Sequence, residues 1–253
     1  MAKVSFAKKS AEVEAEVLVD NSVDTADIPD TTELARRESM QLGAMGGDVK
    51  QSDLRLPRLQ IAYGVGKLAS TYSQGDLVLD GEHLLVHKRE PLVVTLWSTY
   101  TYWKEWLDND AYSAGLRART FGTEAEVLAA GGTTQWGNDG KRPSFSRAVD
   151  LRMFVQKPEK VECGLFGIEL NGKLYSPAVF TVDKMGFAKI QPTIQTAATF
   201  SLKKRGLPAG IWELSTDVSV AGGRTKVLPN IKLTGFNTPE FLEDLKLVFG
   251  DQQ

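Results

Sequence analysis

The sequence predicts a mainly β (α+β) protein, an antiparallel barrel or sandwich with helical insertions and a C-terminal helix. Short runs rich in β-branched and aromatic residues recur along the chain, and Gly, Asp, Asn and Pro separate them at close spacing. These runs do not alternate with helices, as a parallel α/β sheet would require. An antiparallel sheet that closes or doubles on itself accommodates such a pattern.

Charge divides the 253-residue chain into three parts. Residues 1–50 carry 6 Lys and Arg against 10 Asp and Glu, residues 51–238 carry 23 against 18, and residues 239–253 carry 1 against 4. We therefore predict a flexible acidic N-terminal arm over 1–53, a β-rich body over 54–238 and an acidic amphipathic helix or tail over 239–253. A mildly basic body between acidic ends suits contact with a polyanion.

The strands of the body are expected at residues 59–63, 77–87, 92–106, 145–156, 161–170, 173–182, 211–220 and 227–236. The run 77–87 is a hairpin that turns at Asp80-Gly81, and Asn171-Gly172 forms a second tight turn. In the run 145–156, Val149, Leu151, Met153 and Val155 alternate onto one face and Arg152 onto the other.

Besides a short helix candidate over residues 31–47 of the arm, three helices are expected after residue 54. Thr123 and Glu126 have the spacing of a capping box and begin a short helix. The segment 191–206 is the central helix candidate, with an apolar stripe and a basic C-terminal end. Thr238 as N-cap and Pro239 at the first helical position begin the last helix.

The aromatic stretch from Leu92 to Trp106 is the most distinctive part of the chain. It contains five large rings: Trp97, Tyr100, Tyr102, Trp103 and Trp106. Strand alternation places Trp97 and Trp103 on one face. Tyr100 and Tyr102 then lie on the other. The rings could fill a β-core, or they could form a surface on which unpaired nucleobases stack; both interpretations stay open at this point.

Cations surround the aromatic stretch. The candidate nucleic-acid-binding residues are Lys88, Arg89, Trp97, Tyr100, Tyr102, Trp103, Lys104, Trp106, Arg117, Arg119, Lys141, Arg142 and Arg152. A groove that follows a phosphate backbone needs positive charges with stacking rings beside them. A solvated face with local ion pairs would show the same cations.

The sequence offers no catalytic residue, metal site or cofactor site. His83 and His87 are the only histidines, and on a strand a spacing of four keeps them too far apart to share zinc. The G-x-G-x-x-A match that begins at Gly64 lacks the long helix of a dinucleotide site. Cys163 lies in an apolar run as a small hydrophobe. We expect a non-enzymatic, cytoplasmic protein without a membrane span.

Two stretches resemble a known group of proteins. LPRLQIAYGVGKLASTYSQGDLVL (56–79) and SPAVFTVDKMGFAKIQPTIQTAATFSLKKRGLPAGIWELSTDVSV (176–220), with a hydrophobic strand between them, resemble bacteriophage-encoded single-stranded DNA-binding-like proteins. The resemblance covers about residues 54–235. It implies a modified OB barrel and sequence-independent, non-catalytic binding of single-stranded DNA in phage replication or recombination, in the host cytoplasm. It also implies recruitment of replication or recombination proteins through the acidic ends, and we expect a homo-oligomer.

Two other functions stay open. The chain could be a structural or assembly protein, such as a virion component whose N-terminal arm docks on neighbouring subunits. It could also be a phage factor that binds and inhibits a host protein. Closed oligomers indifferent to nucleic acid would favour assembly.

Overall fold

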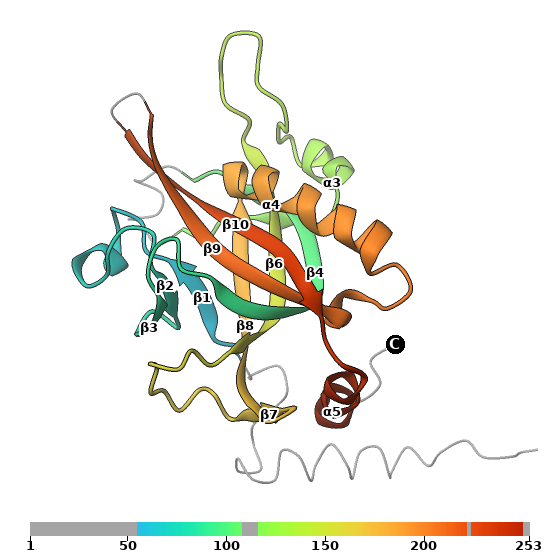
Figure 1. The fold of residues 1–253 in the computed structure, drawn as a ribbon. Coiled ribbons are helices and arrows are strands. Elements are labelled where there is room, and N and C mark those ends of the chain that lie inside the picture. The colour runs from blue at the N-terminus through green and yellow to red at the C-terminus, as the bar shows by residue number, and fades with distance from the viewer. Residues whose placement is uncertain (1–54, 108–115, 222–223, 250–253) are drawn as a thin grey trace, which may run out of the picture. The chain divides into compact units, whose positions relative to one another are not determined.

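The computed structural model describes residues 55–107, 116–221 and 224–249, and the predicted arm lies outside these ranges. One large sheet, curled into a half-barrel, forms the body together with a few helices (Figure 1). The mainly β class with helical insertions and a C-terminal helix is therefore confirmed.

The sheet contains ten strands. In chain order they are β1 (Arg58–Ile61), β2 (Leu77–Leu79), β3 (His83–Val86), β4 (Leu92–Glu105), β5 (Thr120–Phe121), β6 (Phe145–Gln156), β7 (Ile168–Leu170), β8 (Lys173–Asp183), β9 (Gly210–Ala221) and β10 (Arg224–Phe236). The helices are α3 (Glu124–Ala129), α4 (Lys184–Thr196) and α5 (Pro239–Phe249), with short turns η2 (Lys67–Ser70), η3 (Ala197–Ser201) and η4 (Leu207–Ala209).

The strands follow the order β10-β9-β4-β6-β8-β1-β2-β3, with β5 paired to β4 and β7 paired to β8. Every pair is antiparallel except β1 with β8, which is parallel. The long strands β4, β6 and β8 lie side by side and form the centre of the sheet (Figure 1). Most pairings are therefore antiparallel, as the sequence predicts.

Both predicted tight turns are present. Asp80 and Gly81 have φ of 53° and 78°, and Asn171 and Gly172 have φ of 49° and 70°. Positive φ at both central residues is the signature of the type I′ turn, whose twist matches that of the strands it joins. Local turn chemistry thus determines both the β2–β3 and the β7–β8 hairpins.

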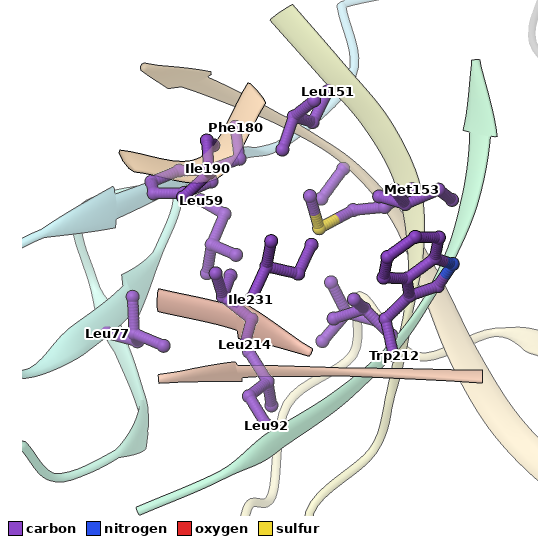
Figure 2. Close-up of a cluster of buried hydrophobic side chains, with 14 of the residues drawn as sticks. Leu59, Leu77, Leu92, Leu151, Met153, Phe180, Ile190, Trp212, Leu214 and Ile231 are labelled. Carbon is purple, nitrogen blue, oxygen red and sulfur yellow. The ribbon is translucent and has the colours of Figure 1, made fainter. Parts of the chain in front are cut away.

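The main core lies inside the curled sheet. Figure 2 shows Leu59, Leu151, Ile190, Trp212 and Ile231 converging from β1, β6, α4, β9 and β10. In β6 the predicted alternation is confirmed: Val149, Leu151, Met153 and Val155 are all fully buried, whereas Arg152 is exposed. Burial of these side chains is the main force that holds the sheet in its curled form.

Two predicted elements are wrong in their bounds. Helix α4 begins at Lys184 rather than at residue 191, and Pro192 lies inside it. Gly186 and Pro192 lower the intrinsic helix propensity of this segment, but Ile190 and Ile194 are buried against the core and so stabilise the helix. Of the run 161–170, only β7 is a strand.

A second, smaller hydrophobic cluster lies on the side of the sheet away from the main core. Phe154, Leu170 and Tyr175 form it with Phe241 and Leu245 of α5. The C-terminal helix is therefore packed on the sheet through its apolar side.

The capping box of α3 gives a first stability prediction. The Thr123 side chain accepts a hydrogen bond from the Glu126 backbone N–H at 3.3 Å, and Glu126 in turn accepts one from the Gly122 N–H at 2.9 Å. We expect Thr123→Ala to lower the free energy of unfolding by about 1 kcal/mol, because it removes an N-cap. Urea denaturation measures this, and Thr123→Ser, which keeps the hydroxyl, should cost less.

Candidate nucleic-acid interface

A bulge in β4 decides which aromatic side chains share a face. The pairing of β4 with β6 shifts between Leu96 and Ser98, so Trp97 is the extra residue. Before the bulge, Leu96 points into the main core; after it, Tyr100 and Tyr102 lie on the opposite, outer side. The prediction that Trp97 and Trp103 share one face is therefore wrong, because a bulge reverses the alternation and no local sequence signal marks it.

Trp97 belongs to the second hydrophobic cluster. Its ring stacks on Phe154 with centroids 5.7 Å apart and an interplanar angle of 16°. Leu242 of α5 packs against the same cluster, which also contains Phe241 and Leu245 of that helix. Trp97 is thus a packing residue rather than an exposed ring.

Trp103 lies on the inner side of β4, near one end of the half-barrel. It pairs across the sheet with Phe121 and with Arg147, whose guanidinium is 6.0 Å from the Trp103 ring centroid and 5.1 Å from that of Phe187. The half-buried indole therefore helps to position Arg147 between two rings.

Tyr100 and Tyr102 lie on the outer side, and neither belongs to the cluster that α5 joins. Their rings stack with centroids 5.8 Å apart, and Tyr100 is 57% exposed. Together with Phe121, Gly122 and Asp150 they line a hollow of about 280 Å³. Tyr102 is half-buried beneath this contact, and the exposed ring of Tyr100 is the one available for stacking.

Trp106 continues the outer side beyond the end of β4. Its indole N–H donates to Ser146 Oγ at 2.6 Å, which fixes the ring against β6. The Arg142 guanidinium lies 5.1 Å from the ring centroid and the Lys184 Nζ lies 4.2 Å from it. The Trp106 ring therefore makes cation–π contacts with two side chains from distant parts of the sequence.

Lys184 occupies an unusual backbone position. Its φ is 53°, in the left-handed region, and it is the first residue of α4. A cation in the first helical turn also opposes the helix dipole. The contact with the Trp106 ring thus stabilises Lys184 at a position that neither its backbone conformation nor the dipole of α4 favours.

Sheet register aligns further cations with the rings. Arg152 of β6 pairs with Ser98 on one side and with Val179 on the other, and Val179 also pairs with Arg58 of β1. Their neighbours Leu59, Leu151 and Phe180 are in the core, so Arg58 and Arg152 point outward from one row. Neither has an ion pair among the residues that the structure describes.

A groove extends this outer side over β1. Tyr63, Lys67, Arg58 and Thr181 line it together with apolar neighbours, and its volume is about 340 Å³. Burial, with the charge of Asp183 nearby, raises the pKa of the Tyr63 hydroxyl. Tyr63 is thus a fourth partly exposed ring on this side.

We define the ring-and-cation face by eleven residues on this outer side of the sheet. They are Arg58, Tyr63, Tyr100, Tyr102, Lys104, Trp106, Arg142, Asp150, Arg152, Asp183 and Lys184. The face carries five cations against two carboxylates. One cation is neutralised, since Lys104 Nζ lies 3.4 Å from Asp183 Oδ2.

The remaining predicted residues lie elsewhere or are already paired. Arg119 forms a two-point ion pair with Glu105, at 2.7 and 3.0 Å, and this pair lowers the pKa of the Glu105 carboxyl. Lys141 pairs with Asp139 at 3.0 Å. Lys88 and Arg89 are in the turn after β3, where Arg89 donates to the Val218 carbonyl at 3.5 Å. Arg117 is exposed, next to residues that lie outside the described ranges.

Sequence reasoning missed five members of the face: Arg58, Tyr63, Asp150, Asp183 and Lys184. Arg58 is the first residue of β1, Tyr63 follows that strand, and Asp183 and Lys184 lie where β8 ends and α4 begins, so each is more than 20 residues away from the aromatic stretch along the chain. Only the pairing of β1 with β8 and of β8 with β6 brings these residues close to the aromatic stretch. For Asp150, the alternation of β6 was a usable signal, because it already places this carboxylate on the side opposite the buried residues.

Comparisons with known proteins give no relative: no protein-family model, curated protein or solved structure matches the chain. In the described ranges, no helix combines the length and apolar character needed to cross a membrane. Across the same residues, no cluster of His, Cys, Asp or Glu side chains is suited to hold a metal ion.

Proposed function

We propose that the protein binds single-stranded nucleic acid, without catalysis and without sequence dependence, along the ring-and-cation face. The observation that carries this proposal is the exposed ring of Tyr100, stacked on Tyr102 and flanked by Arg152 on β6 and by Trp106 with its two cations along the strand. Rings that stack bases beside cations that neutralise phosphates are what such binding requires.

Each part of the face has a separate task in this proposal. Tyr100 and Trp106 stack bases, which every base permits because every base has a π-face. Arg58, Arg152 and Lys184 contact phosphates, because they are exposed and have no carboxylate partner among the described residues. No step of this function needs a nucleophile, a metal or a cofactor.

The finer parts of the proposal rest on the sequence resemblance. An OB fold is a partly open five-stranded barrel, whereas the sheet path here runs through eight strands, so an OB-like identity stays a prediction. The same holds for a role in phage replication or recombination, for partner recruitment by the acidic ends and for a homo-oligomer. In the C-terminal acidic segment, Phe241 and Leu245 of α5 are packed in the second hydrophobic cluster.

Salt dependence tests the phosphate part of the proposal. Fluorescence anisotropy of labelled oligo-dT should show an affinity that falls steeply as salt rises. The variant Arg58→Ala/Arg152→Ala/Lys184→Ala should reduce the slope of log K against log salt by about 2, since each phosphate contact on a single strand contributes about 0.7.

The turn after η3 offers a matched control. Lys203→Ala/Lys204→Ala/Arg205→Ala removes the same charge from exposed positions that are not part of the face. If both triple variants change the slope equally, only net charge matters and the face is not the binding site. Binding that ignores salt altogether would contradict the proposal.

A further inference from the structure

A carboxylate lies in the middle of the ring-and-cation face. Asp150 of β6 is the direct cross-strand partner of Tyr100 and lines the same hollow as Tyr100 and Tyr102. A negative charge at this place repels the phosphates that the surrounding cations attract. If the face bound only the sugar-phosphate backbone, removal of this carboxylate would raise its affinity for the strand. The position of Asp150 therefore favours a role in contacts with the bases.

Hydrogen bonds fix the orientation of this carboxylate. Tyr102 donates its hydroxyl to Asp150 Oδ1 at 3.1 Å, and Thr181 donates its hydroxyl to the same oxygen at 2.6 Å. Burial, followed by the nearby charge of Asp150, raises the pKa of the Tyr102 hydroxyl, which therefore stays a donor at neutral pH. Two donors from β4 and β8 thus hold one oxygen of a residue on β6.

The second oxygen, Oδ2, accepts no hydrogen bond from the residues that the structure describes. An ionised carboxylate can only accept hydrogen bonds. A partner for Oδ2 in the hollow must therefore be a donor. Among the exocyclic groups of nucleobases, the amino groups of cytosine, adenine and guanine are such donors, and carboxylates accept from cytosine N4 in known recognition.

We propose that Asp150 reads the base that stacks on Tyr100, accepting a hydrogen bond from its exocyclic amino group, so that the face prefers amino-bearing bases over thymine and uracil. Uracil and thymine carry the carbonyl oxygen O4 where cytosine carries N4, and two acceptors facing each other repel. This inference rests on the proposed function. It adds a base preference to a surface that otherwise reads no sequence.

Cytosine and uracil give the sharpest comparison, because they have the same ring size and neither carries a methyl group. We expect wild-type protein to bind oligo-dC about tenfold more tightly than oligo-dU of equal length, at equal salt and pH 8, as one hydrogen bond to a charged group contributes. In Asp150→Asn this ratio should fall toward one. Both oligonucleotides should bind somewhat more tightly, because a negative charge is lost.

Asp183→Asn is the matched control. It removes the other carboxylate of the same face, which pairs with Lys104 and makes no side-chain cap to α4. We expect it to raise both affinities and to keep the dC:dU ratio of the wild type. Thermal melts of both variants show whether each is folded.

The outcomes separate the two proposals. Equal binding of oligo-dC and oligo-dU by the wild-type protein, which needs no variant, overturns the base preference and leaves single-strand binding standing. A wild-type ratio that Asp150→Asn leaves unchanged in a folded protein also overturns it, because another group then reads the base. If neither oligonucleotide binds at low salt, the proposed function fails and the base preference with it.

Discussion

Replacing Phe154 by alanine should lower the free energy of unfolding by about 3–5 kcal/mol, the usual cost of removing a buried phenyl ring. Phe154 is 1% exposed, and its ring supports Trp97 on one side and belongs to the cluster that anchors α5. The loss therefore includes both the transfer of the ring and a cavity between the sheet and the helix. Guanidinium denaturation followed by circular dichroism measures it.

Phe200 provides the comparison for this prediction. Its side chain is 78% exposed in the π turn after α4, so Phe200→Ala should change the free energy of unfolding by less than about 0.5 kcal/mol. A similar small change for Phe154→Ala would mean that α5 is not packed on the sheet as described. The second hydrophobic cluster would then not exist as described, and Trp97 would be a further ring exposed on the outer side.

Features with a local cause could be predicted from the sequence. The turns at Asp80-Gly81 and Asn171-Gly172 depend on residues that tolerate positive φ, and the core side of β6 follows from strict alternation. The start of α3 at Thr123 depends on its own side chain. Each of these signals lies within a few residues of the structure it determines.

Features set by tertiary packing could not be predicted. The bulge at Trp97 reverses the faces of β4, and nothing in its neighbours along the chain marks it. Helix α4 starts early because Ile190 and Ile194 are buried, despite an internal Pro192. The candidate site follows the same division. The sequence predicts its rings and the cations close to them along the chain, whereas strand pairing brings Arg58 to the site and a contact with the Trp106 ring brings Lys184.

The rings of the aromatic stretch therefore divide between packing inside the protein and a candidate stacking surface. Trp97 packs against the cluster that α5 joins, and Trp103 contacts Arg147 on the inner side of the sheet. Tyr100 is exposed on the outer side, and Trp106 is half-buried there beside Arg142 and Lys184. Substitution of Trp103 is therefore expected to affect folding, and substitution of Tyr100 or Trp106 is expected to affect binding.

The double variant Tyr100→Ala/Trp106→Ala should weaken binding of oligo-dT more than any other change proposed for this face. Each base stacked on a ring contributes about 1–3 kcal/mol, so the loss of both should cost about 2–6 kcal/mol if the two sites are independent. That is a drop in affinity of at least about 25-fold. The slope of log K against log salt should change little, because the phosphate contacts remain.

Trp136→Ala controls for the loss of an exposed indole, because Trp136 is 66% exposed in the loop before β6 and makes no part of the face. It should leave the affinity for oligo-dT within about twofold of the wild type. The double variant removes rings but no charge, so it should lower the affinity and leave the salt slope nearly unchanged. The triple cation variant removes charge but no ring, so it should reduce the salt slope. An affinity loss in the double variant that disappears at high salt would show that Tyr100 and Trp106 act by positioning Arg142 and Lys184 rather than by stacking on bases.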